Sequence, residues 1–545
     1  MTGARLEEKF SSSYDNGSAE QQPVQSNEYN LAAEHDQLER GLKSRHIQFL
    51  ALGGAIGTGL FIGSGAILHD TGPAPLFMAY ITMMIVVWCV MNVLAEMVTY
   101  LPMRGITVPY FVGRFLDPSL AFAAGWNYWY AYAMLVGAEA TAAGIIIEYW
   151  KPPVGIWLWI LIVLIVTLGL NIIAVSVFGE AEFWFASIKL ITIMGLIILG
   201  ICVAAGVRQD GPRGFRYWND PGAFAEYNAT GATGHFLGYW HAVVAAGFAF
   251  ITSPELIAIA AGETVAPRRN IPKAARRFIY RLAFFYGVTS LVIGFMVPYN
   301  DDRLLGGSDA SASPFVIGIK NLGITVLDHI INAAVLTSAW SAGNSFLYSG
   351  SRVLYSMSLD GNAPRFLSRT NKQGVPWVAV LVTWAPGLLA FLNVSNTGAQ
   401  VFNWFVNIST ISGYIAWIVV LITYIRFRKA MIFNRMLDAL PYKTILQPYA
   451  SWFFLCFLIV LTITNGFQIF INGNWDYRNF IAAYVTLPIF LCLYLGHKIY
   501  FRTRWAIPVH EIDVITGKEE MDRLEQMDEE RVPSNIFQRF WYWLA

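Results

Sequence analysis

Charged side chains are scarce in this 545-residue chain, in which Asp, Glu, Lys and Arg together make up 13% of the residues. Soluble domains carry about 25%, whereas here 56% of the residues are hydrophobic. A formal net charge of +1 lacks the basic excess of nucleic-acid-binding proteins, so we expect no nucleic acid partner. Because each membrane crossing needs roughly 20 apolar residues, the composition predicts an all-α polytopic membrane protein.

Cysteine is also rare. Cys89, Cys202, Cys456 and Cys492 all lie inside apolar runs and form neither a disulfide framework nor a zinc-ligand spacing. The run GGAIGTG resembles a phosphate-binding loop but lacks the GK[ST] ending and a preceding strand. With no nucleophile–base pair in view either, we expect no enzyme, no cofactor and no metal ion.

Apolar runs recur between two polar tails. Residues 1–44 are rich in Ser, Asn, Gln and acids, which predicts a disordered tail. Residues 501–545 form a second polar tail, with a surface helix predicted at 518–531. Between the tails we predict twelve transmembrane helices, at residues 46–67, 73–101, 119–147, 155–178, 183–207, 236–261, 278–298, 325–356, 377–394, 400–425, 449–472 and 477–500.

The distribution of lysine and arginine predicts the orientation. An even number of crossings puts both tails on one side of the membrane. If that side is the cytosol, the cytosolic loops hold sixteen Lys and Arg residues and the outer loops seven. Because cytosolic loops carry the positive excess, we expect both termini in the cytosol, with the first helix acting as a signal anchor.

The first apolar segment, HIQFLALGGAIGTGLFIGS, is unusually rich in glycine. Its glycines are Gly53, Gly54, Gly57, Gly59 and Gly63. A helix broken at Gly57-Thr58-Gly59 would turn its freed N–H and C=O groups toward a cavity. The start of its outer half would then attract an anionic group such as a carboxylate. A continuous helix that packs closely through small residues is the alternative.

A second break is predicted in the segment 236–261, where Thr252-Ser253-Pro254 interrupts an apolar run. Proline removes a helical hydrogen bond and clashes with the preceding turn; a simple proline kink is the alternative. The two breaks lie five segments apart. That spacing is typical of two five-helix repeats of inverted topology, with the binding site where they meet and the last two helices appended.

Among the ionisable residues inside apolar segments, where charges are costly and often functional, three are the leading candidates for a role at the site. Glu139 stands among small residues in MLVGAEATAAG and either faces a cavity or makes a buried structural hydrogen bond. Lys189 either snorkels to the cytosolic interface or loads and releases a proton, because desolvation disfavours its charged form. Glu255 follows the second break and receives either a substrate amine or a structural hydrogen bond.

Several long motifs resemble one family. LKSRHIQFLALGGAIGTGLFIGSG, GEAEFWFASIKLITI, GFRYWNDPGAF and GETVAPRRNIPKAARR look like those of the fungal amino-acid permeases, the yeast amino-acid transporter family of the amino acid–polyamine–organocation superfamily. The resemblance runs from about residue 42 to about residue 520. Within the family, GWNYWYAYAMLVGAEATAA and FAFITSPEL look most similar to the proline permeases.

The resemblance implies a leucine-transporter-type fold, a plasma-membrane location and proton-driven uptake. By resemblance, the substrate carboxylate site falls on Gly57, Thr58 and Gly59. The carbonyls that face the amine fall around Ile56 and the stretch from Phe250 to Ser253.

Two further roles follow from the same resemblance. Lys189 matches a lysine that occupies the place of a sodium ion in similar sodium-independent transporters, and Phe248 or Phe250 would cover the substrate. Most members have Gly and then Ser or Thr before the glutamate, whereas Ser253-Pro254 precedes Glu255 here, so the choice of phenylalanine stays open.

We therefore expect a proton-coupled symporter for L-proline and other small neutral amino acids. Its transport core would be residues 45–425, followed by two further helices at 426–500. Proton binding at Lys189, Glu139 or Glu255 would bias the outward- and inward-facing states differently. Membrane lipid and protons are the expected partners, with ubiquitin-ligase machinery at tail lysines such as Lys9 and Lys43.

Two alternatives remain. A permease for 4-aminobutyrate or acidic amino acids would share most of these motifs, but an acidic substrate would want a cationic partner, and no arginine lies near the middle of the predicted site helices. A non-transporting amino-acid sensor could share the fold; such sensors tend to carry a longer cytosolic extension than the 44-residue tail here.

Overall fold

The computed structural model describes most of the chain between residues 57 and 523. The described residues are 57–102, 107–173, 175–206, 214–252, 254–255, 267–304, 313–324, 326–471, 473–519 and 522–523. The predicted tail 1–44, most of the predicted surface helix 518–531, and the predicted site residues Ile56 and Ser253 lie outside them.

The described residues form helices and no strands. The α-helices are α3 (Ser64–Thr71), α4 (Pro73–Tyr100), α5 (Val108–Phe115), α6 (Pro118–Glu148), α7 (Ile156–Ile173), α8 (Val175–Ala205), α9 (Gly231–Ala246), α11 (Pro267–Leu282), α12 (Thr289–Met296), α13 (Pro314–Asn321), α14 (Leu327–Leu359), α15 (Trp377–Trp384), α16 (Gly398–Phe433), α17 (Tyr449–Ile463), α18 (Tyr477–Tyr484) and α19 (Thr486–Phe501).

Shorter π and 3₁₀ turns interrupt or join these helices. The π-helical turns are η1 (Gly59–Gly63), η2 (Trp218–Gly222) and η4 (Ala283–Val288). The 3₁₀ turns are η3 (Gly247–Ala249), η5 (Arg365–Ser368), η6 (Ala385–Val394), η7 (Leu437–Ala439), η8 (Phe467–Phe470) and η9 (Val509–Glu511).

The protein is an all-helical, multi-pass membrane protein. Within the described residues, seven helical stretches are long and apolar enough to cross a bilayer, or eight if α18 and α19, which meet at a 44° bend, count as one span. The seven are Pro73–Tyr100, Pro118–Glu148, Ile156–Ile173, Gly179–Ala205, Pro267–Met296, Trp377–Val394 and Gly398–Phe433.

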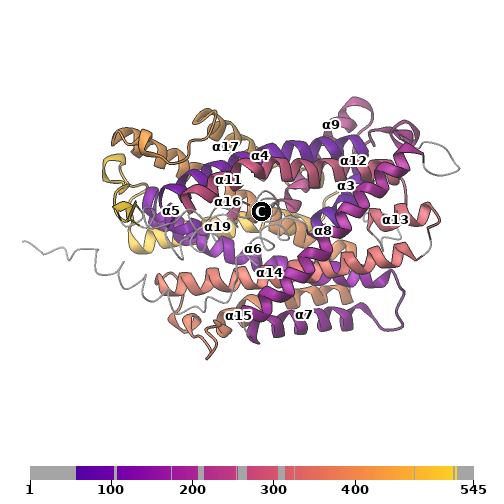
Figure 1. The fold of residues 1–545 in the computed structure, drawn as a ribbon, viewed down its shortest axis with the longest axis horizontal. Coiled ribbons are helices and arrows are strands. Elements are labelled where there is room, and N and C mark those ends of the chain that lie inside the picture. The colour runs from indigo at the N-terminus through magenta and orange to yellow at the C-terminus, as the bar shows by residue number, and fades with distance from the viewer. Residues whose placement is uncertain are drawn as a thin grey trace, which may run out of the picture.

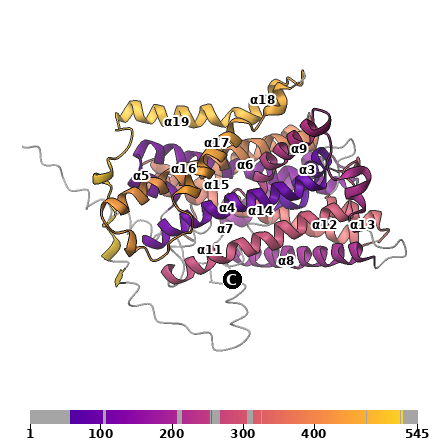
Figure 2. The same cartoon turned by 90° about the horizontal axis from the view of Figure 1, so that it is seen from above.

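Helix α6 lies at the centre of the bundle. It packs mainly against α14 and α16, and 89% of its most apolar window is buried, against 28% for α7 and 39% for α8. Helix α8 crosses the bundle obliquely in Figure 1. Figure 2 shows α19 at one edge of the bundle and α8 at the opposite edge. The exposed apolar side chains of α8, such as Ile191 and Ile198, fit contact with lipid tails.

Some helix boundaries differ from those expected. The helix predicted at 278–298 begins at Pro267, because its first turns carry basic side chains that hydropathy does not register as helical. Residues 175–178, expected at the end of the segment 155–178, belong to the start of α8. Helices α5 and α13 were not predicted, since eight residues are too few to give a clear apolar run.

The segment after α19 is docked on the bundle rather than merely polar. Tyr100, at the end of α4, donates its hydroxyl proton to the carbonyl of Val514 at 2.8 Å. The Arg114 side chain, on α5, donates to the carbonyls of Asp513 and Thr516 at 2.9 and 2.7 Å. Val514 is almost fully buried. The chain after α19 therefore links the ends of α4 and α5.

Candidate functional site

The centre of the candidate site is a hydrogen bond between the first helix and α6. The Thr58 hydroxyl donates to Oε1 of Glu139 at 2.7 Å, and both side chains are buried. Thr58 is the N-cap of η1, and Glu139 lies in the second half of α6. A Cβ built on Gly343 of α14 would lie 3.3 Å from Cβ of Glu139. Three elements therefore converge on this carboxylate.

The backbone next to Thr58 can receive an anion. In the described residues the predicted first helix begins at the π-turn η1 and continues as α3. The first N–H groups of a helix have no partner inside it and carry partial positive charge. Leu60 and Phe61 already donate to the carbonyl of Gly57, so in this chain those groups belong to Gly57, Thr58 and Gly59, the three residues predicted to hold a carboxylate.

The break predicted in the segment 236–261 is visible in the described residues. Helix α9 ends at Ala246 and continues only as the 3₁₀ turn η3. Thr252 then adopts a positive φ of 69°, in the left-handed region that a helix cannot contain. Tyr414 of α16 packs against this break and donates its hydroxyl proton to the carbonyl of Val244 at 2.8 Å.

Two tyrosines donate hydrogen bonds to carbonyls of η1 and η3. The Tyr80 hydroxyl donates to the carbonyl of Gly59 at 3.2 Å, and the Tyr286 hydroxyl donates to the carbonyl of Ala249 at 2.8 Å. The two rings stack on each other with centroids 5.9 Å apart. The Gly59 carbonyl also accepts the backbone N–H of Ser64, so Tyr80 of α4 is a second donor to it, and Tyr286 of η4 supplies a side-chain donor to the carbonyl at the end of η3.

The two candidate phenylalanines face different neighbours. Phe250 is fully buried and stacks on Tyr286 at 4.3 Å, with Tyr80 at 5.7 Å. Phe248 keeps 7% of its surface exposed, packs edge-on against Phe402 of α16, and lies beside Gly63 of the first helix. Phe248 is thus the candidate next to η1, whereas Phe250 packs against Tyr80 and Tyr286.

Lys189 is buried in α8, with 1% of its surface exposed. It lies close enough to Glu139 and Glu182 for its charge to interact with both carboxylates. The structure therefore joins Thr58 to Glu139 by a hydrogen bond, with Lys189 near enough for its charge to act on that carboxylate. Sequence reasoning missed Glu182, although its position seven residues before Lys189 places both on the same face of a helix, two turns apart.

Glu255 lies apart from these residues. Its Oε1 accepts hydrogen bonds from Trp417 Nε1 at 3.1 Å and from the Tyr128 hydroxyl at 3.4 Å. These partners come from α16 and α6, so the geometry favours the structural hydrogen bond over contact with a substrate amine. The second oxygens of Glu255 and Glu139 have no hydrogen-bond partner within the described part of the chain.

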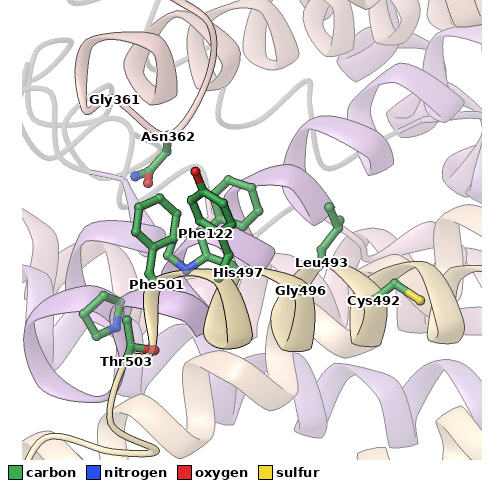
Figure 3. Close-up of a pocket in the computed structure, with 11 residues that line it drawn as sticks. Phe122, Gly361, Asn362, Cys492, Leu493, Gly496, His497, Phe501 and Thr503 are labelled. Carbon is green, nitrogen blue, oxygen red and sulfur yellow. The ribbon is translucent and has the colours of Figure 1, made fainter.

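Other binding features are few. Within the described residues, no cluster of three or more His, Cys, Asp or Glu side chains is arranged to hold a metal ion. Figure 3 shows a cavity of about 640 Å³ between the start of α6, the turn after α14 and the second half of α19, lined by residues such as Phe122, Asn362 and His497. Its lining includes none of the predicted site residues, so we treat it as separate from the candidate site.

Comparison with known proteins identifies the family. Residues 46–507 match the sequence model of the family described as amino acid permease. A proline-specific permease of Emericella nidulans is 55% identical over 94% of both chains. A probable proline-specific permease of Schizosaccharomyces pombe is 54% identical over 90% of both chains, and a proline-specific permease of Saccharomyces cerevisiae is 50% identical over 93% of this chain and 83% of its own. The chain belongs to the amino acid permease family and is an amino-acid transporter of the membrane.

Proposed function

We propose that this permease is a plasma-membrane symporter that imports L-proline, and other small neutral amino acids, together with protons. The identity of 50–55% to three proteins named for proline, over nearly the whole chain, carries the substrate assignment. The buried side chains of Thr58, Glu139 and Lys189 supply the chemistry that suits the coupling to protons.

Substrate recognition would use the two helix breaks. The carboxylate of the substrate caps the N–H groups of Gly57, Thr58 and Gly59, which the start of η1 presents. The amine points to carbonyls of the broken helices around Ile56 and from Phe250 to Ser253. A secondary amine such as that of proline has only two N–H donors, so few acceptors and a close apolar wall suffice. Phe248, beside the outer half-helix, supplies that wall.

Proton coupling would act through Glu139 and Lys189. Glu139 touches the first helix through Thr58 and interacts with Lys189 of α8. A change in its protonation therefore alters the contact between moving parts of the transporter. A proton drives transport only if the outward- and inward-facing states differ in affinity for it, and a carboxylate shared between helices satisfies that requirement. Glu255, with its aromatic partners, keeps only a positioning role in this proposal.

The proposed architecture has twelve spans, with both termini in the cytosol. Residues 45–425 form two five-helix repeats of inverted topology, as in leucine-transporter-type folds, and residues 426–500 add two helices. In this architecture the substrate site lies where the two repeats meet, and the close approach of η1 to η3 supports that arrangement. Lysines of the terminal tails, including Lys9 and Lys43, would serve ubiquitin-ligase machinery.

Rival substrates fit the site less well. An acidic amino acid needs a cationic partner for its second carboxylate. The cation at this site is Lys189, and two carboxylates already balance its charge. A 4-aminobutyrate molecule separates its charged groups by more atoms than proline does, so its amine would overshoot the carbonyls beside the break.

The deciding experiment is uptake of radiolabelled L-proline into permease-deficient yeast that expresses this chain. Uptake is measured from pH about 4.5 to pH about 7 in steps of about half a pH unit, with and without an uncoupler. We expect saturable uptake that falls at neutral pH, is abolished by the uncoupler, and is competed by small neutral amino acids but not by glutamate. Transport of a different amino acid alone would contradict the substrate assignment. A surface-expressed protein that transports nothing would indicate a sensor.

A further inference from the structure

A carboxylate at the end of α3 lies between two histidines. Asp70 is the last residue but one of α3, and its Oδ1 lies 2.9 Å from Nδ1 of the adjacent His69. Its other oxygen, Oδ2, lies 3.6 Å from Nε2 of His241 on α9. The three side chains keep between 16% and 31% of their surface exposed. None of them has a part in the function proposed above.

The contact between Asp70 and His241 joins the two elements that carry the helix breaks. Helix α3 continues directly from η1, and α9 leads directly into η3. The two helices pack against each other and lie side by side in Figure 2. Because Gly59 of η1 lies against Ala249 of η3, a shift of α3 along α9 would also shift the backbone groups that are proposed to receive the substrate.

Neighbouring side chains orient both members of this pair. His69 holds one oxygen of Asp70, which leaves the other oxygen facing α9. The ring of Tyr227, from the segment before α9, stacks on His241 with the centroids 4.4 Å apart and the planes at 17°. A carboxylate attracts a protonated imidazole, as does the face of an aromatic ring. Both attractions are lost when the imidazole is neutral.

The titratable groups that face the pair come from several elements. His69 lies in α3, Tyr227 precedes α9, and the charge of Asp302, from the segment after α12, acts on His69. Helix α4 packs on both helices, but its first turn carries no titratable side chain, and the charged residues of α16 lie in its last turns. When His69 is protonated it shares the charge of Asp70 with His241, so the three groups titrate as a unit.

The acid of this unit stays charged when the histidines change charge. Burial raises the pKa of Asp70, but the contacts and charges of His241 and His69 lower it by more, so it lies below its usual value. Histidine side chains change charge between about pH 5 and pH 8. The charge that varies over this range is therefore that of the imidazoles, and the strength of the contact between α3 and α9 varies with it.

Backbone hydrogen bonds fasten the neighbouring segment at every pH. The N–H of Ala225 donates to the carbonyl of Thr71 at 2.9 Å, and the N–H of Ala74 donates to the carbonyl of Ala223 at 3.0 Å. These bonds hold the segment before α9 rather than α9 itself. The side-chain pair thus adds a pH-dependent contact to a joint whose backbone part does not titrate.

We propose that Asp70 and His241 are positioning residues whose ion pair, when the imidazole is protonated, fixes α3 against α9 and so sets the spacing of η1 and η3 for binding of the substrate. We call this pair the outer latch. It is fully formed at acidic pH and is lost as the pH rises and the imidazole gives up its proton, so the affinity for proline falls. The proton returns to the same solution from which it came. The proposal rests on the substrate site proposed above.

A purely structural contact is the competing explanation. Loss of either side chain would then weaken transport equally at every pH, because packing does not depend on protonation. Two variants separate the explanations. His241→Gln keeps a hydrogen-bonding group but cannot become charged, and Asp70→Asn keeps the shape and removes the charge. Asp70→Glu restores the acid and is the conservative variant.

The test uses the full-length permease in proteoliposomes, with the same pH on both sides so that no proton gradient contributes. The KM for exchange of internal for external proline is measured at pH about 5, 6, 7 and 8. His235→Gln is the matched control, because His235 lies in the same helix and its ring packs on Phe224 rather than beside an acid. Equal reconstitution of all variants is confirmed first.

We expect the KM of His241→Gln to exceed that of the wild type by about two- to fivefold at pH about 5, the range that a partly exposed ion pair supports, and to equal it at pH about 8. Asp70→Asn should behave in the same way. The double variant should show no further rise, because the two substitutions remove one shared interaction. Asp70→Glu should keep the pH dependence of the wild type, and His235→Gln should keep its KM throughout.

Two results would overturn the proposal. One is a KM ratio between His241→Gln and the wild type that is the same at every pH, which shows a structural contact; the other is a ratio of one throughout. If one single variant does not reach the membrane, the other decides. If neither does, a wild-type KM that does not rise with pH overturns the proposal. A wild type that exchanges no proline refutes the proposed substrate assignment instead, and this outcome appears before any variant is made.

Discussion

The backbone of Gly59 lies directly against that of Ala249. A Cβ built on Gly59 would lie 2.6 Å from the Cα of Ala249 and 3.0 Å from its Cβ. The two residues begin η1 and end η3, so the contact joins these two turns, and their carbonyls accept hydrogen bonds from Tyr80 and Tyr286. The distance between η1 and η3 therefore depends on the absence of a side chain at residue 59.

Replacement of Gly59 by Ala should push the two half-helices apart. Overpacking of this kind costs about 1–3 kcal/mol, and the displaced backbone groups would no longer meet one substrate. We expect proline uptake to fall by roughly 10–100-fold, with normal amounts of protein at the surface. Uptake kinetics and surface labelling are the measurements.

Gly169→Ala is the control for that substitution, because a Cβ built on Gly169 of α7 would meet nothing within 4 Å. It should transport like the wild type. Normal uptake by Gly59→Ala would show that the close contact with Ala249 does not position the substrate.

The hydrogen bond between Thr58 and Glu139 predicts a second pair of effects. Thr58→Val keeps the volume but leaves the buried carboxylate without its donor, at a cost of about 1–3 kcal/mol. We expect a rise in KM for proline. Glu139→Gln keeps a partner for Thr58 but removes the acid, so it should lose accumulation and keep more of its exchange activity.

Thr423→Val is the matched control for Thr58→Val. The Thr423 hydroxyl is buried but donates only to a carbonyl of its own helix, that of Val419 at 2.7 Å. Its loss should leave the KM unchanged. An equal rise in KM in both variants would point to general destabilisation rather than to the site.

The two phenylalanines of the second break should respond differently to substitution by leucine. Phe248→Leu alters the wall beside the outer half-helix and should change KM and the competition by other amino acids. Phe250→Leu loses its contacts with Tyr80 and Tyr286, and each aromatic pair contributes about 0.5–1.5 kcal/mol beyond its buried area. It should lower the melting temperature of the purified protein more than it changes selectivity. The opposite pattern would make Phe250 the residue that covers the substrate.

The docked segment after α19 should depend on Arg114. Arg114→Ala removes the donors to Asp513 and Thr516, which we expect to weaken docking by about 1–3 kcal/mol. Limited trypsin digestion of the purified permease should then cleave faster after Lys518. Arg504→Ala is the control, since the Arg504 side chain is exposed and its hydrogen bonds, within the described residues, go to Glu511, while the bond that its backbone carbonyl accepts from Lys498 is unaffected by the substitution. Equal cleavage of wild type and Arg114→Ala would contradict the docking.

The docking of this segment also predicts a pH dependence. Partial burial raises the pKa of Asp513. Hydrogen bonds from Thr516 and from the N–H of Ile515, together with the charge of Arg114, lower this pKa by more than burial raises it, so it lies below its usual value. A carboxyl whose pKa is depressed on folding stabilises the folded form above its unfolded pKa, and this contribution is lost as the pH falls through the folded pKa.

Hydrogen exchange of residues 508–518 should therefore stay slow at neutral pH and at pH about 5, and increase only below about 3.9, the ordinary pKa of aspartate. Exchange rates are corrected for their intrinsic dependence on pH. The Asp513→Asn variant should not show the acid transition. Loosening of the wild type near pH 6 would assign the transition to another group.

Much of the helix arrangement could be predicted from hydropathy alone. The limits of α4, α6 and α14 fall within three residues of the predicted spans, because long apolar runs in a bilayer have few alternatives. The start at Pro267 and the short helix α5 were missed, since polar turns of a helix carry no apolar signal. The second break was expected from Pro254, yet the chain already leaves the α-helix at Gly247.

By itself, the sequence determined that this protein spans a membrane as helices and that Glu139 and Lys189 lie inside helical segments, where both are buried. A chain with so few charges and such long apolar runs is stable only with those runs inside a lipid bilayer. Only the tertiary structure decided which of these groups meet. Thr58 lies 81 residues from Glu139 along the chain, and Glu182 lies 159 residues from Ser341. Such pairings arise from how the helices pack, because side chains far apart in sequence become neighbours only after several helices share one core.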